Sequence, residues 1–128
     1  MVVLDTSFII KFVRKEVSID IFNDDEKFIT THLLDYEFAN VMWKMAKHQG
    51  LSTIDVKNFF ASVDAIGIEK HQSNPMKLFL YATETGLTAY DASYLLLAKK
   101  YKCPIATFDK QLIDVSNKEG IEVIATKD

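Results

Sequence analysis

Short apolar runs alternate with longer amphipathic segments along the whole chain. Four runs rich in β-branched or small apolar residues predict strands at 2–5, 27–30, 104–107 and 121–125, and a fifth short strand is expected at 67–69. In the intervening segments apolar residues recur every three or four positions, which predicts helices. The expected helices are 6–14, a short one at 18–23, 31–49, 52–65, 74–85, 88–101 and 109–118.

This alternation predicts the fold class. Strands that alternate with helices favour a parallel sheet covered on both faces, so we expect an α/β fold, a three-layer α/β/α sandwich with a central parallel sheet. The chain has 128 residues, of which 48% are hydrophobic, and that is enough for one domain with a substantial core. We therefore expect a single domain over residues 1–128.

Local signals mark where several helices begin and end. Ser52 and Asp55 have the spacing of a capping box, and Pro75 follows Asn74 as a first-turn proline follows its N-cap. Gly50 and Gly86 each come directly after a predicted helix, where a left-handed residue commonly ends it.

Acidic residues stand at four places where a predicted strand ends or a helix is beginning. They are Asp5, Glu37, Asp91 and Asp109. Parallel strands end at one edge of their sheet, where open α/β folds bind their ligands, so we expect these carboxylates to lie close together. Each acid also has a purely structural explanation: three of them can cap a helix, and Glu37 can be an exposed residue facing a lysine.

Four neighbouring carboxylates repel one another unless a cation neutralises them. Ligands that are all oxygen atoms select hard ions, Mg²⁺ or Mn²⁺. Such ions commonly activate water for phosphodiester hydrolysis. The sequence offers no rival centre, because His32, His48 and His71 are scattered and no serine lies in a nucleophile-elbow motif.

The charge balance limits how a polyanion could be bound. The chain has 15 basic and 18 acidic side chains, a net charge of -3, so only local lysines or metal ions would hold a polyanion. On helix 31–49, Lys44 and His48 share a strip with Glu37, which makes them candidates for contact with a nucleic-acid backbone or simply solvated residues. Tyr36 and Trp43 lie on another side, where they either pack under helix 52–65 or meet a partner subunit.

Other features concern the cellular setting. Cys103 is the single cysteine, which excludes an internal disulfide and suits a reducing compartment; we expect it to be an inert core residue. No signal peptide is visible and no apolar run reaches the roughly 18 residues of a membrane span. We expect a soluble cytoplasmic protein without membrane association.

Four motifs in a fixed order carry a family resemblance. They are Val3-Leu4-Asp5-Thr6-Ser7, Glu37 with Asn40 three residues later, Tyr90-Asp91-Ala92, and Thr107-x-Asp109. The chain resembles the PIN-domain ribonucleases over essentially its whole length, and most of all the VapC-type toxins of toxin-antitoxin pairs.

The resemblance implies a metal-binding active site formed by Asp5, Glu37, Asp91 and Asp109. It implies supporting roles for Thr6, Ser7, Asn40 and Thr107. It further implies RNA cleavage dependent on Mg²⁺ or Mn²⁺, a homodimer, and inhibition by a cognate antitoxin of the VapB type.

One position departs from the family pattern, and two other functions stay open. Some members carry a further acid where this chain has Gln111, and Asp114 lies about one turn beyond, so the number of metal ions is open. A non-catalytic PIN-like interaction module is the first alternative. A response-regulator receiver is the second, although Asp5 lacks the adjacent acid that a receiver needs after its first strand.

Overall fold

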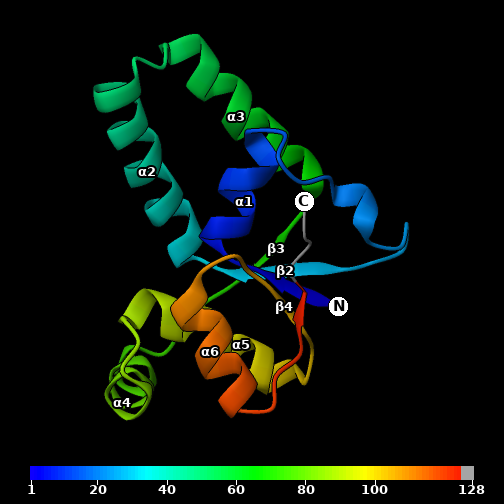
Figure 1. Ribbon diagram of the computed structural model, residues 1–128, viewed down its shortest axis with the longest axis vertical. Helices are drawn as coiled ribbons and strands as arrows, with labels where there is room; N and C mark the ends of the chain where they lie inside the picture. The colour runs from blue at the N-terminus through cyan, green and yellow to red at the C-terminus, as the bar shows by residue number, and fades with distance from the viewer. Residues whose placement is uncertain (125–128) are drawn as a thin grey trace.

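The computed structural model describes residues 1–124 and has three layers (Figure 1). Within that range five strands pair in parallel in the order β3-β2-β1-β4-β5. The strands are β1 (Val2–Leu4), β2 (Phe28–Thr31), β3 (Glu69–His71), β4 (Ile105–Ala106) and β5 (Val123–Ile124). The helices are α1 (Thr6–Val13), α2 (Leu33–Gln49), α3 (Thr53–Ile66), α4 (Pro75–Thr85), α5 (Ala89–Tyr101) and α6 (Lys110–Lys118), with a short 3₁₀ turn, η1 (Ile19–Ile21).

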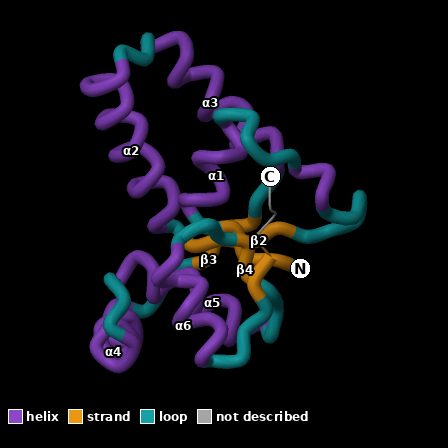
Figure 2. Tube along the Cα trace, viewed as in Figure 1, coloured by secondary structure: helices purple, strands orange, loops and turns teal. Residues whose placement is uncertain are grey.

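The helices are divided between the two sides of the sheet. Helices α1, α2 and α3 lie on one side, and α2 and α3 form a long hairpin that extends away from the strands (Figure 2). Helices α5 and α6 lie on the other side, with α4 packed against α5. The predicted α/β/α sandwich with a parallel central sheet is therefore confirmed.

The core lies where α5 and α1 meet the central strand. All three residues of β1 are buried, as expected for a strand with parallel neighbours on both sides and helices on both faces. Helix α5 buries Tyr94, Leu95 and Leu97 in different directions, because it is covered by both the sheet and α4.

The predicted elements agree with the structure to within two residues at each end. The segment 18–23 is a single 3₁₀ turn instead of a short helix, with Ser18 as its N-cap. The capping box of Ser52 and Asp55 is present, and Gly50 ends α2 in the left-handed conformation. Position 125 of the last predicted strand lies outside the described residues. None of the helices in residues 1–124 has the length and apolar character needed to span a membrane.

Candidate active site

The four predicted acids lie on segments that begin at the same end of the sheet. Helices α1, α2 and α6 follow β1, β2 and β4 directly, and because the strands are parallel these helices all start at the strands' carboxyl ends (Figure 1). Asp5 comes directly after β1 and Asp109 directly before α6, Glu37 lies in the second turn of α2, and Asp91 lies in the first turn of α5.

Asp5 is buried and fully hydrogen-bonded. Only 2% of its surface is exposed. Its Oδ1 accepts from the backbone N–H of Phe8 at 2.9 Å and from the hydroxyl of Ser7 at 2.8 Å, and its Oδ2 accepts from the hydroxyl of Thr107. Burial raises the pKa of Asp5 to about 7 against the effect of these bonds, and the charge of Asp91 adds to the rise. Asp5 thus caps α1, and its negative charge destabilises the folded protein because it is buried.

Glu37 joins three helices. Its Oε1 accepts from the hydroxyls of Thr6 on α1 and Tyr94 on α5, the latter at 2.8 Å. The two hydroxyl oxygens are themselves 2.7 Å apart. Glu37 is therefore held in place from two sides. It is not the exposed residue facing a lysine that its purely structural explanation required.

Asp91 is half-buried and electrostatically coupled to the other acids. Burial is the main reason that its pKa is raised to about 6, and the charges of Asp109 and Glu37 add to the rise. A hydrogen bond with Thr88 opposes it. Thr88 accepts from the backbone N–H of Asp91 at 3.2 Å, but the reciprocal bond of a capping box does not occur among the described hydrogen bonds. The predicted capping box is therefore half formed.

Asp109 caps α6 and is connected to Asp5 through a hydroxyl. Its Oδ1 accepts from the backbone N–H of Leu112 at 2.8 Å, and its own N–H donates to the hydroxyl of Thr107 at 3.1 Å. Ser7 accepts from the N–H of Phe108 at 2.9 Å. These bonds fix the segment after β4 against the first turn of α1.

The donor chemistry of this end of the sheet suits a hard divalent cation. The four acids offer oxygen ligands only, and none of them takes part in an ion pair with a lysine, arginine or histidine of residues 1–124. Burial raises the pKa values of Asp5 and Asp91, and the charges of neighbouring acids add to the rise. The residues therefore fit Mg²⁺ or Mn²⁺.

The four acids do not form a complete metal-binding site in this arrangement. Among residues 1–124 no three histidine, cysteine, aspartate or glutamate side chains are placed so that they could hold one ion. The ligand set remains a prediction.

The remaining predicted residues lie outside this cluster. Asn40, Lys44 and His48 are exposed on α2, and their side chains make none of the hydrogen bonds found within residues 1–124. Gln111 donates to the carbonyl of Gly86 at 3.3 Å and so ties α6 to the segment after α4.

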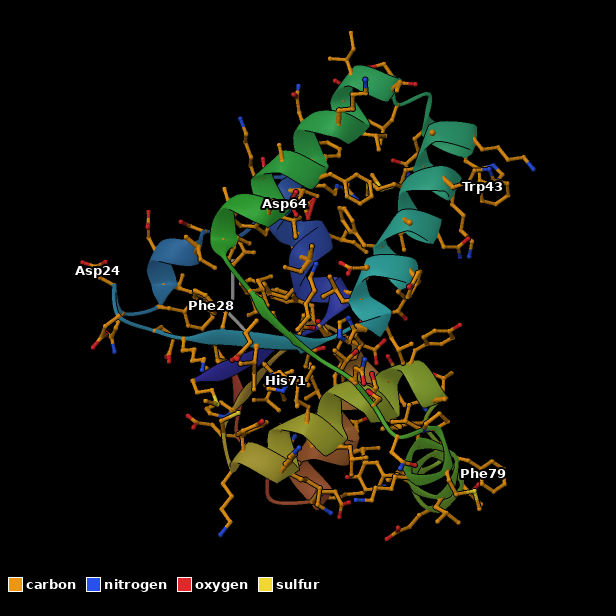
Figure 3. All side chains as sticks on the ribbon, turned by 180° about the vertical axis from the view of Figure 1, so that it is seen from behind. Asp24, Phe28, Trp43, Asp64, His71 and Phe79 are labelled. Atoms are coloured by element: carbon orange, nitrogen blue, oxygen red, sulfur yellow. The ribbon has the colours of Figure 1, made fainter. Side chains whose placement is uncertain are left out.

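The structure decides between the two interpretations of the exposed aromatics. Tyr36 is 72% exposed and Trp43 is 58% exposed, so the alternative in which they pack beneath α3 is excluded. Trp43 lines a shallow hollow between α2 and α3, with its ring beside Lys47, and points away from the sheet (Figure 3). Both aromatics are available to a ligand or partner.

Sequence reasoning missed Tyr94 as a site residue. It lies in a helix whose pattern indicates only burial, and its ring is buried, yet its hydroxyl forms hydrogen bonds with Glu37 and Thr6. Its spacing of three residues from Asp91 places both on one face of a helix, which was the available signal. Burial and the charge of Glu37 raise the pKa of Tyr94 well above its usual range, so it remains a donor.

Comparison with known proteins finds a matching family model and similar proteins that are named as ribonucleases. The PIN domain model matches residues 2–118. A Pyrobaculum aerophilum protein named "Ribonuclease VapC3" is 30% identical over 89 residues, which cover 66% of this chain and 68% of that protein. "VapC ribonuclease Mb0985" of Mycobacterium bovis is 26% identical over 89 residues, 70% of each chain.

A solved structure has the same fold. The crystal structure of PAE2754 from Pyrobaculum aerophilum matches with a TM-score of 0.77 at 24% identity, over 95% of this chain and 82% of that chain. Because the family model spans nearly all of the described residues, the chain belongs to the PIN domain family.

Proposed function

We propose that this protein is a metal-dependent ribonuclease that hydrolyses RNA phosphodiester bonds and acts as the toxin of a VapBC-type toxin-antitoxin pair. The observation that supports the proposal is electrostatic: the charges of neighbouring acids add to the raised pKa values of Asp5 and Asp91, and no positive side chain of residues 1–124 forms an ion pair with any of the four acids. The relatives named as VapC ribonucleases support the reaction and the toxin role.

In this proposal Asp5 and Asp91 bind the principal Mg²⁺ or Mn²⁺, and Glu37 and Asp109 complete the site directly or through water. When bound, such an ion lowers the pKa of water and neutralises charge on the phosphate. Binding requires Asp5 and Asp91 to lose their protons, which their raised pKa values make dependent on pH.

The hydroxyl side chains orient the carboxylates. Ser7 and Thr107 hold the two oxygens of Asp5, and Thr107 in turn accepts from the backbone of Asp109. Thr6 and Tyr94 hold one oxygen of Glu37 and leave the other without a described hydrogen bond. These bonds fix the direction of each carboxylate before any substrate arrives.

Two protein partners complete the proposal: a VapB-type antitoxin and a second copy of this chain. Met76, Phe79 and Leu80 are exposed on α4, and Phe79 points outward from the molecule (Figure 3). An exposed apolar helix face of this kind is suited to a subunit interface, so α4 is our candidate surface for the homodimer.

A second candidate function is a non-catalytic PIN-like interaction module. It is favoured by the finding that no three side chains of residues 1–124 are already arranged as metal ligands. Such a module would neither bind a divalent ion in the acidic cluster nor cleave RNA.

Cleavage of total RNA separates the two candidates. We expect the purified chain to cut RNA with Mg²⁺ or Mn²⁺ and not with a chelator. The cleavage rate of Asp5→Asn should be at least about 100-fold lower, because loss of a residue that only orients a metal ligand already costs roughly 10- to 100-fold. Asp64→Asn is the matched control, because Asp64 is exposed on α3 away from the cluster (Figure 3). Equal cleavage by the wild type and Asp5→Asn would reject the assigned site.

A further inference from the structure

Two exposed tyrosines lie next to the proposed active site. Tyr36 directly precedes Glu37 on α2, and Tyr90 directly precedes Asp91 on α5. Both rings line one open hollow of about 640 Å³ between the starts of these helices. The hydrogen bond between Tyr94 and Glu37 at 2.8 Å fixes the distance between α2 and α5, so the two rings belong to a preformed site.

These rings contribute little to the packing of the protein. Tyr36 is 72% exposed and Tyr90 is 48% exposed, and neither phenol hydroxyl makes a hydrogen bond within residues 1–124. Aromatic side chains usually bury most of their surface, so two exposed rings lining one hollow are available for a ligand.

The rest of the hollow is suited to a planar polar ligand. We call it the tyrosine hollow; besides Tyr36 and Tyr90 it is lined by the polar residues His32, Gln72 and Ser73 and by four apolar residues of α2, α4 and α5. The side chains of His32, Gln72 and Ser73 take part in none of the hydrogen bonds among the described residues. Rings that can stack, with donors and acceptors at their edge, are the features by which proteins bind single-stranded nucleobases.

A basic groove continues from the tyrosine hollow. Gln72 and Ser73 also line a second hollow of about 470 Å³ along α5, whose other lining residues include Lys77, Lys99 and Lys100. Lys99 pairs with Glu119, whereas Lys77 and Lys100 are in no ion pair within residues 1–124. We call this the lysine groove. It concentrates positive charge on a chain whose net charge is -3.

We propose that the tyrosine hollow binds a base of single-stranded RNA beside the cleavage site, and that the lysine groove binds the phosphates of the following nucleotides. This inference rests on the proposed function and adds a path for its substrate. On the neighbouring helix α4, Lys77 lines the lysine groove, whereas the exposed face formed by Met76, Phe79 and Leu80 is apolar. The observations therefore assign RNA to the tyrosine hollow and the lysine groove, and protein to that apolar face.

Binding of a fluorescein-labelled RNA 12-mer of mixed sequence tests the path. Measured by anisotropy in EDTA, binding does not depend on metal or on catalysis. We expect Tyr36→Ala and Tyr90→Ala each to weaken binding roughly tenfold, since stacking supplies much of the affinity for a single base. Tyr36→Phe, which keeps the ring, is expected to bind within about twofold of the wild type.

The controls come from the same elements. Trp43→Ala removes an equally exposed aromatic of α2 that lines a different hollow, and it is expected to leave affinity unchanged. Lys77→Ala and Lys100→Ala are expected to weaken binding and to flatten its salt dependence, whereas the tyrosine variants keep the wild-type slope. Melting curves exclude unfolding of each variant.

The possible outcomes separate this inference from the proposed function. If RNA is bound and cleaved but both alanine variants bind normally, the tyrosine hollow is overturned while the ribonuclease stands. If the alanine variants lower RNA affinity although Asp5→Asn cleaves as well as the wild type, the binding site stands and the assigned centre fails. A change in sedimentation of the alanine variants with unchanged RNA affinity would mark the hollow as a protein interface and overturn the inference.

Discussion

The hydroxyl of Tyr94 donates to Oε1 of Glu37 across 2.8 Å and so joins α5 to α2 at the acidic cluster. Together with the bond from Thr6, it orients the carboxylate of Glu37. It connects residues 57 positions apart in sequence.

We predict that Tyr94→Phe lowers the rate of RNA cleavage at least tenfold, the usual effect of losing a group that orients a metal ligand. The ring still fills the core, so the free energy of unfolding should fall by only about 1 kcal/mol. Tyr81→Phe is the control, because Tyr81 is also buried and donates to Glu119 at 2.7 Å far from the acids.

Both phenylalanine variants should lose similar stability in chemical denaturation, and only Tyr94→Phe should lose activity. Equal activity of the two variants would show that the bond to Glu37 is structural.

The raised pKa of Asp5 predicts an unusual stability profile. Its folded-state pKa of about 7 lies above the ordinary 3.8, so the folded protein binds more protons between these values. This contribution to stability is present at low pH and is lost as pH rises through about 7. Asp5→Asn, which mimics the neutral acid, should therefore melt higher than the wild type at pH 8 in EDTA, by a smaller margin at pH 5, and about equally only as the pH approaches 3.8.

Thermal melts in EDTA check this, with Asp64→Asn as the exposed control that should melt like the wild type at both pH values. A lower melting temperature for Asp5→Asn at pH 8 would contradict a costly buried charge at Asp5.

Divalent ions should offset the destabilising negative charge of Asp5. Millimolar Mn²⁺ is expected to raise the melting temperature of the wild type, because an ion that binds only the folded state stabilises it by mass action. The rise should be larger at pH 8 than at pH 6, since Asp5 and Asp91 must lose protons to bind. Asp91→Asn should show little or no rise, and a wild type that melts identically with and without Mn²⁺ would favour the non-catalytic module.

Lys44 and His48 of α2 lead to a separate prediction. If Lys44 contacts the RNA backbone, Lys44→Ala should flatten the plot of RNA affinity against salt by roughly one phosphate contact. Lys57→Ala, which removes an exposed lysine of α3, should leave the slope unchanged. An unchanged slope for Lys44→Ala would remove Lys44 from the RNA contacts, and the same measurement applies to His48.

The order of elements could be predicted because its signals are local. The capping box of Ser52 and Asp55 and the glycine after α2 lie within a few residues of the helix ends that they mark. The structural explanations of Asp5 and Asp109 are confirmed, because each caps the helix that follows it.

What the sequence could not provide is the pairing of distant side chains. The hydroxyl of Thr107 reaches Asp5 across 102 positions, and Tyr94 reaches Glu37 from a helix whose pattern indicates only burial. The sequence left the exposure of Tyr36 and Trp43 open for a related reason. Tyr36 lies on a face of α2 that α3 does not cover, and the angle between those helices is a tertiary property.

Diffraction from crystals soaked in MnCl₂ tests the central claim most directly, because the anomalous signal locates the ion without reference to activity. We predict a manganese peak at the carboxyl edge of the sheet, within bonding distance of both Asp5 and Asp91, that is lost in Asp91→Asn. A chain that cleaves RNA under these conditions yet shows no manganese at that edge would contradict the account.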